Sequence, residues 1–270
     1  MIKEQQGGIK VLVFSFGGRR FWRRLAGLVF VLLLVSLTYG LVFDASQKVI
    51  SVLAQSGKLR PIYGVGTTEK KVALTFDATC GAERTPKLLK ILKANDLQAT
   101  FFLVNIWLDK YPEEVRQIAA AGHEIGLHSA THPHFTSLSP GQMETELKDN
   151  HQKIKEITGC EPVLFRPPYG DYDNTVIEVA GKCGYKTIQW SVDSLDWKDL
   201  SAEEIYNRVI KNVHPGSIIL FHNDGKNTPE ALLPIIQQLR GEGYRMVPVS
   251  ALIYQDNYYI DVNGIQQRKQ

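Results

Sequence analysis

The sequence contains little cysteine. Its 270 residues include three, Cys80, Cys160 and Cys183, so at least one thiol stays unpaired within the chain. None of them has the Cys-x-x-Cys spacing of structural zinc sites. A disulfide-stapled scaffold is therefore excluded, and Cys160 and Cys183 are expected to be small core residues. With 44% hydrophobic residues, the chain is long enough for one large domain or two small ones.

An excess of basic charge is also missing from most of the chain. The net charge is +3, but residues 1–24 hold six Lys or Arg and one Glu, which leaves −2 for residues 44–270. A nucleic-acid binder needs a basic surface, so this class is excluded for the bulk of the protein. Internal repeats, low-complexity tracts and a Gly-rich phosphate fingerprint are absent from the sequence as well.

One long hydrophobic run is present. Residues 25–43 are 19 residues without charge, enough to cross a bilayer at about 1.5 Å per residue. A cleaved signal peptide would need a shorter apolar core, and Asp44-Ala45-Ser46 is a poor cleavage site. A buried globular helix would show an amphipathic stripe. We therefore expect a single transmembrane helix, with the basic residues before it cytoplasmic and the rest of the chain exported.

These features predict five segments. They are a cytoplasmic basic segment (1–24), a transmembrane anchor (25–43), a stalk or lead-in (44–68), the main folded domain (69–254) and a polar tail (255–270) that is expected to cover little.

Strand and helix patterns alternate from Lys71 onward. Short apolar runs predict strands at 72–76, 99–104, 124–127, 162–165, 185–191, 217–221 and 245–249. Helical periodicity predicts helices at 85–95, 112–121, 139–158, 175–183, 202–213 and 229–241. About seven such repeats favour an α/β domain with a parallel sheet. Because polar side chains follow nearly every strand, a distorted (β/α) barrel fits better than an open sheet.

Two histidines follow the third predicted strand. His128 and His132 are four residues apart, and a helical backbone there would turn both imidazoles toward one point, as metal ligands require. The alternative is a pair of loop or cap histidines. The spacing alone does not decide between these interpretations.

Acid–base candidates follow the other strands. Asp77, at the mouth of a buried strand, suits a general base, although it could be a turn aspartate. Arg166 could hold that carboxylate ionised, and the stiff loop after it could aim the Tyr169 N–H at an oxyanion. Asp196 could orient His222 as a general acid. Without such partners, Arg166 would be a surface residue and His222 a core histidine.

Taken together, five ordered motifs resemble the polysaccharide deacetylases of carbohydrate esterase family 4, over about residues 69–254. The motifs are Thr75-Phe76-Asp77-Ala78, His128-Ser129-Ala130-Thr131-His132, Arg166-Pro167-Pro168-Tyr169-Gly170, Asp193-Ser194-Leu195-Asp196-Trp197 and Leu220-Phe221-His222. The amino-terminal anchor also resembles that of sporulation-associated members from Gram-positive bacteria.

The resemblance implies a divalent metal, usually zinc, and a role for each matched residue. In this family's pattern Asp77 is the base, Arg166 holds it, the Tyr169 N–H is the oxyanion donor, and Asp196 orients the acid His222. His128 and His132 correspond to metal ligands. Leu220, Trp197 and Pro168 correspond to substrate-binding residues around the acetyl group and sugar.

One position departs from the family's pattern. The first motif commonly ends in a second Asp that completes the metal triad, and here that residue is Ala78. Cys80 could substitute as a thiolate ligand, but an ordinary loop cysteine is the expected alternative. We therefore expect weak or altered metal binding.

The resemblance implies de-N-acetylation of an extracellular amino-sugar polymer, peptidoglycan above all, by a monomeric membrane-anchored hydrolase. Within the enzymes, an O-acetyl polysaccharide esterase or a chitin-type oligosaccharide deacetylase is the alternative. From another class, a catalytically silent carbohydrate-binding domain is the alternative, because Ala78 breaks the triad.

Overall fold

The computed structural model describes residues 57–269 and a few positions between 18 and 40. The chain divides into two units, residues 1–57 and the compact unit 58–270. Apart from Gly18 and Gly57, the described positions of the first unit are helical. The helices searched among the described residues include none long and apolar enough to cross a bilayer. Most of the run 25–43, and with it the predicted anchor, lies outside the described residues.

A wall of parallel strands forms the centre of the compact unit. Its order is β6 (Lys186–Thr187), β5 (Leu164–Phe165), β4 (Glu124–Leu127), β3 (Thr100–Leu103), β2 (Lys71–Ala78), β8 (Ile218–His222) and β7 (Val192–Asp193). Strand β9 (Arg245–Met246) also pairs with the start of β2. These seven strands and their helices form a half-barrel, consistent with the predicted distorted (β/α) barrel.

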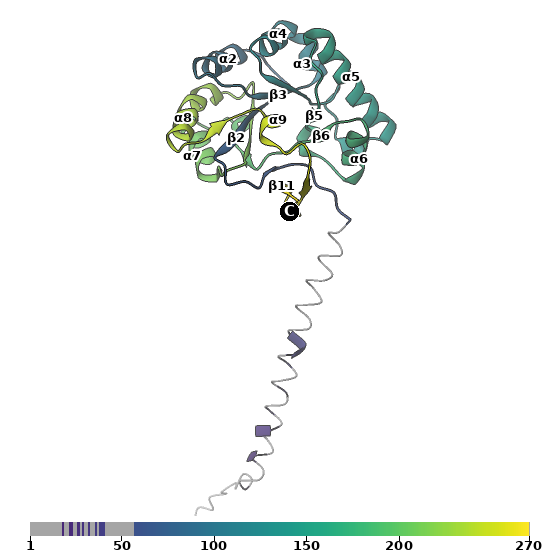
Figure 1. Ribbon diagram of the computed structural model, residues 1–270, viewed down its shortest axis with the longest axis vertical. Helices are drawn as coiled ribbons and strands as arrows, with labels where there is room; N and C mark the ends of the chain where they lie inside the picture. The colour runs from purple at the N-terminus through teal and green to yellow at the C-terminus, as the bar shows by residue number, and fades with distance from the viewer. Residues whose placement is uncertain are drawn as a thin grey trace, which may run out of the picture. The chain divides into compact units, whose positions relative to one another are not determined.

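Helices cover the outside of this wall (Figure 1). They are α2 (Thr85–Ala94), α3 (Asn105–Lys110), α4 (Pro112–Ala120), α5 (Pro140–Thr158), α6 (Asn174–Lys182), α7 (Ala202–Asn212) and α8 (Thr228–Gly241). The short helix α9 (Val249–Leu252) packs instead on the opposite face of the strands, with Ala73 and Phe102. The capping boxes of Ser139 with Gln142 and of Ser201 with Glu204 begin α5 and α7, because each satisfies free N–H groups of a first turn. Helix α3 was not predicted, since its six residues are too short to show a period.

The core explains why the strands lie where they do. Strand β2 is buried along almost its whole length, as a central parallel strand with helices outside and side chains inside must be. Phe76 stacks between Phe101 and Phe221, with ring centroids 5.0 and 5.5 Å apart. These three rings join β2, β3 and β8, so the carboxyl ends of the three strands are fixed relative to one another.

The single strand predicted at 185–191 is wrong. Its beginning is β6, and β7 follows only after the chain has crossed to the other end of the wall. The crossing segment forms irregular hydrogen bonds: Gln189 donates to Ile62, and Ser191 donates to Ile218. Because these bonds run to the lead-in and to β8, the segment cannot continue as one straight strand.

The polar tail covers more than expected. It forms β10 (Tyr258–Ile260) and β11 (Ile265–Arg268), and β11 pairs in parallel with β1 (Gly64–Val65). Gln266 is fully buried and exchanges two hydrogen bonds with the Tyr254 backbone. The expectation that the tail covers little of the domain is therefore wrong. A polar side chain such as Gln266 can be buried when its donor and acceptor groups are both hydrogen-bonded.

Candidate active site

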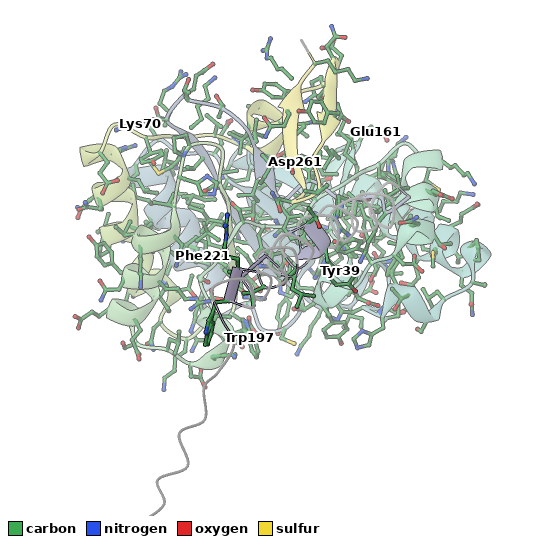
Figure 2. All side chains as sticks on the ribbon, turned by 90° about the horizontal axis from the view of Figure 1, so that it is seen from below. Tyr39, Lys70, Glu161, Trp197, Phe221 and Asp261 are labelled. Carbon is green, nitrogen blue, oxygen red and sulfur yellow. The ribbon has the colours of Figure 1, made fainter. Side chains whose placement is uncertain are left out.

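A cavity of about 470 Å³ opens at the carboxyl ends of the strands. Its lining includes Asp77, His128, His132, Tyr169, Trp197, Leu220 and His222. Seven of the ten predicted site residues therefore meet at one cavity. Arg166 and Asp196 lie beneath it, fully buried, and Pro168 is buried without lining it. Figure 2 shows Trp197 on the side of the unit away from the small sheet that carries Asp261.

Arg166 holds Asp77 on the cavity floor. Its Nη1 donates to Asp77 Oδ1 at 2.7 Å and to Thr75 Oγ1 at 2.9 Å, and its Nη2 donates to the Gln189 carbonyl at 3.1 Å. The guanidinium also lies over the Phe102 ring, 4.1 Å from its centroid. Arg166 is thus a fully buried partner of Asp77. This matches the prediction of a group that orients a base, and not the alternative of a surface arginine.

The ion pair determines the charge state of Asp77. Burial alone raises the pKa of this carboxyl group, but the charge of Arg166, helped by His128 and His222, outweighs burial and holds the pKa below its usual value. Asp77 is therefore an ionised carboxylate at neutral pH. Its Oδ1 is taken by Arg166, which leaves Oδ2 to face the cavity.

His128 and His132 converge without a helix. The backbone between them is a loop, with left-handed φ values at Ser129 (75°) and His132 (58°). The two imidazoles nevertheless lie edge to face with centroids 5.0 Å apart. The convergence was expected only on a helical backbone. It is present without one, because two left-handed residues fold the loop back on itself.

The tautomer of His128 is fixed by its neighbour. Its Nδ1 lies 2.8 Å from the Arg166 carbonyl oxygen, which can only accept, so Nδ1 carries the proton. The Nε2 lone pair then points toward Asp77 Oδ2, 3.7 Å away. Burial lowers the pKa of His128, and burial together with His128 lowers the pKa of His132 to about 4. Both rings are therefore neutral at pH 7, the form in which histidine binds metals.

Asp196 and His222 form a second pair across the cavity. Asp196 Oδ1 lies 2.8 Å from His222 Nδ1, while Oδ2 accepts from the His222 backbone N–H at 2.8 Å and from the Thr228 hydroxyl at 2.6 Å. Burial lowers the pKa of His222, but the hydrogen bond and charge of Asp196 outweigh it, so the pKa lies above its usual value. His222 is therefore able to donate a proton near neutral pH.

The remaining predicted residues form the mouth of the cavity. Tyr169 has a left-handed φ of 59°, and its N–H makes no hydrogen bond among the described residues. Its ring stacks on His134 at 4.3 Å. Trp197 is 56% exposed, whereas Leu220 is 3% exposed. A free N–H, an apolar wall and an exposed ring are together suited to an acetylated sugar.

Four lining residues were not predicted as site residues. Thr79 and Trp190 lie outside every predicted motif, whereas Gly170 and Asp193 lie within motifs but were given no role. Trp190 belongs to the segment that was predicted as a continuous strand, so no pattern marked it as exposed to a site. Thr228, which fixes the Asp196 carboxylate, begins α8 and looks in the sequence like an ordinary helix start. In the sequence, neither Trp190 nor Thr228 can be distinguished from an ordinary packing residue.

The residues present do not complete a metal site. Ala78 is fully buried in the apolar core, so it offers no ligand atom. Cys80 is exposed and does not line the cavity, which argues against a substitute thiolate. Within the described part of the chain, groups of three His, Cys, Asp or Glu side chains able to hold a metal ion are absent. The two neutral histidines of the cavity lining supply two of the donors that zinc prefers, short of a complete set.

The comparisons with known proteins agree with this arrangement. The polysaccharide deacetylase family model matches residues 64–188. A peptidoglycan-N-acetylglucosamine deacetylase of Bacillus cereus is 37% identical over 70% of this chain and 91% of its own length. The peptidoglycan-N-acetylmuramic acid deacetylase PdaA of Bacillus subtilis is 32% identical over 78% and 81%.

Solved structures also align over most of the chain. BA3943 from Bacillus anthracis, a CE4 family pseudoenzyme, superposes with a TM-score of 0.69 at 31% identity, over 78% of this chain and 73% of that one. Deacetylases of this family generally depend on a divalent metal. From the matched motifs, the cavity and these relatives, the chain belongs to the polysaccharide deacetylase family, hydrolases that act on amide bonds.

Proposed function

We propose that this chain removes N-acetyl groups from peptidoglycan, an N-acetylated amino-sugar polymer. The observation that carries the proposal is that a carboxylate base, Asp77, and an imidazole acid, His222, line the same cavity, each with its own charged partner. Arg166 lowers the pKa of Asp77 and so favours its ionised form, and Asp196 raises the pKa of His222 and so favours its protonated form. A base and an acid whose pKa values are pushed in opposite directions are what amide hydrolysis requires. The names of two relatives add the substrate class.

In the proposed reaction the chain's own residues perform three tasks. Asp77 accepts a proton from water, whose oxygen bonds to the acetyl carbon. The free Tyr169 N–H stabilises the oxyanion that forms there. His222 then donates its proton to the sugar nitrogen as the carbon–nitrogen bond breaks, which releases acetate and leaves a free amine on the glycan.

The proposal includes weak metal binding. His128 and His132 supply two neutral nitrogen donors, but the position of a third ligand is the methyl group of Ala78. A site short of one carboxylate loses affinity, because two neutral donors do not offset the dication's charge. Zinc, when bound by the family's full triad, polarises the acetyl carbonyl.

The proposal also places the compact unit outside the cell, anchored by residues 25–43. Its support is the sequence alone: an uncharged run of 19 residues follows four arginines within six positions. The same argument supports a membrane location and, by resemblance to anchored members of the family, a role in sporulation.

A silent glycan-binding protein is the second candidate. The specific observation for it is Ala78, together with the structural similarity to a pseudoenzyme of the same family. Against it stand two enclosed ion pairs, Asp77–Arg166 and Asp196–His222. A binder that never moves protons has no need of either.

The test measures acetate released by the purified full-length chain. The substrates are N-acetylglucosamine oligomers, peptidoglycan and an O-acetylated polysaccharide, each with zinc, with cobalt and with chelator. We expect release from peptidoglycan that falls at least a hundredfold in the Asp77→Asn variant, given typical contributions of about 10²–10⁴ for a general base.

Three outcomes would decide otherwise. Equal release by Asp77→Asn and wild type would exclude the proposed base. Release from the O-acetylated polymer alone would identify an esterase. Glycan binding without release under any condition would favour the silent binder, and recovery of release in Ala78→Asp would then attribute the silence to the missing ligand.

A further inference from the structure

A second hollow adjoins the catalytic cavity. It has a volume of about 630 Å³ and lies between α7 and the segment that leads into β7. Trp190 and Asp193 line both hollows, so a polymer that places one sugar in the cavity can continue into the second. We call this second hollow the α7 groove.

The α7 groove is basic. Arg208 and Lys211 line it from one face of α7, together with the amides of Asn207 and Asn212. Both cations are exposed, and neither forms an ion pair within the part of the chain that the structure describes. Asp193 is the one carboxylate among the described lining residues, so positive charge is in excess.

Arg208 is positioned and not merely present. Its Nε donates to the Asp193 carbonyl oxygen at 2.7 Å, which fixes the guanidinium beside the boundary of the two hollows. The two Nη groups make no hydrogen bond to the described residues. The Asp193 carboxylate is in turn engaged by the Leu195 N–H at 2.9 Å. A fixed fork of free N–H donors is a geometry suited to a carboxylate.

We propose that the α7 groove binds the carboxylates of peptidoglycan on a sugar next to the one being deacetylated. The inference rests on the proposed function and narrows its substrate. Trp190 offers a ring face to the glycan at the boundary of the two hollows, and Arg208 and Lys211 bind the acidic substituent. A chitin-type polymer carries no carboxylate, so the groove selects peptidoglycan over neutral N-acetylglucosamine oligomers.

Two sources of carboxylate exist in peptidoglycan, the lactyl group of muramic acid and the stem peptide attached to it. Three ligands separate them: glycan strands with intact stems, strands stripped of stems so that lactyl carboxylates are free, and neutral N-acetylglucosamine hexamers. Each ligand is titrated calorimetrically into the full-length chain and into the Arg208→Gln/Lys211→Gln variant at low salt. Acetate release is measured in parallel.

The matched control is Arg116→Gln/Lys148→Gln, which removes the same charge from α4 and α5. We expect the groove variant to bind the acidic glycans about three- to tenfold more weakly than wild type, as suits exposed charges. Neutral hexamers should bind as before, and the control should match wild type. Arg208→Lys, which keeps the charge, should retain part of the binding.

The outcomes are distinct. Weaker binding of stripped strands assigns the lactyl carboxylate, and weaker binding of intact strands alone assigns the stem peptide; both support the inference. Equal losses on all three ligands, or no loss on the acidic ones, would overturn it. If acetate release is absent throughout, the proposed hydrolysis fails while the binding comparison still tests the groove.

Discussion

Replacing Arg166 by methionine should leave a buried charge without its partner. Arg166 is fully enclosed, and the Asp77 side chain is 6% exposed. Removing one member of a buried pair costs about 3–5 kcal/mol, because water cannot solvate the remaining carboxylate. Methionine preserves the contact with Phe102 while deleting all three hydrogen bonds. Against a total stability of about 5–15 kcal/mol, the loss is measurable without abolishing the fold.

The cost should depend on pH in a definite direction. In wild type the pKa of Asp77 is lowered, so the ion pair stabilises the fold above the pKa of the unfolded chain, about 3.9, and that contribution is lost as pH falls through the folded value. Without Arg166 the strongest influence that opposes burial is gone, so the pKa of Asp77 should rise. The destabilisation by Arg166→Met should therefore be largest near pH 8 and shrink toward pH 5, as the carboxylate takes up a proton.

Urea unfolding of four proteins measures this directly: wild type, Arg166→Met, Asp77→Asn and the double variant, each at both pH values. The double variant should be more stable than Arg166→Met at pH 8, because it carries no buried charge. Arg116→Met, in an exposed pair with Glu113 at 3.1 Å, is the control and should change stability by less than about 1 kcal/mol. Equal destabilisation by Arg166→Met at both pH values would refute the reasoning.

Three further predictions concern the metal, the acid and the tail. Ala78→Asp should raise zinc retention after dialysis by more than about tenfold, whereas Cys80→Ala should leave it unchanged; a loss with Cys80→Ala would show that the thiol is a ligand. Asp196→Asn should lower the pKa of His222, so in an NMR titration its imidazole proton resonances should shift at a lower pH than in wild type. The loss of activity on the basic side of the pH profile should move to lower pH as well. An unchanged titration midpoint would show that Asp196 does not set the pKa of His222. Deleting residues 257–270 should lower the melting temperature by about 2–4 °C for each kcal/mol lost, and an unchanged melting curve would show that β11 adds nothing.

The sequence predicted most of the site because strand ends converge. Once Asp77, Arg166 and His222 are placed after buried parallel strands, closure of the wall brings them to one end. The pairings Asp77–Arg166 and Asp196–His222 followed from charge and from the matched motifs. Their burial and hydrogen-bond distances are properties of the packed structure alone.

What the sequence did not reveal depends on irregular backbone. The loop from His128 to His132 converges through left-handed residues that are not glycine, which no periodic pattern predicts. Trp190 reaches two hollows because its segment leaves one end of the wall for the other. The buried Gln266 reads as a polar tail residue until its partners at Tyr254 are known. Each case is a tertiary contact that overrides a local preference.

The lead-in from Lys58 is part of the barrel and not a flexible linker. Ile62 pairs in parallel with Ile188, and Val65 donates to the Gly216 carbonyl, so this stretch bridges the segment after β6 and the start of β8. A pull on the chain upstream of Lys58 would therefore load a row of backbone hydrogen bonds in shear, beside the segment that carries Trp190.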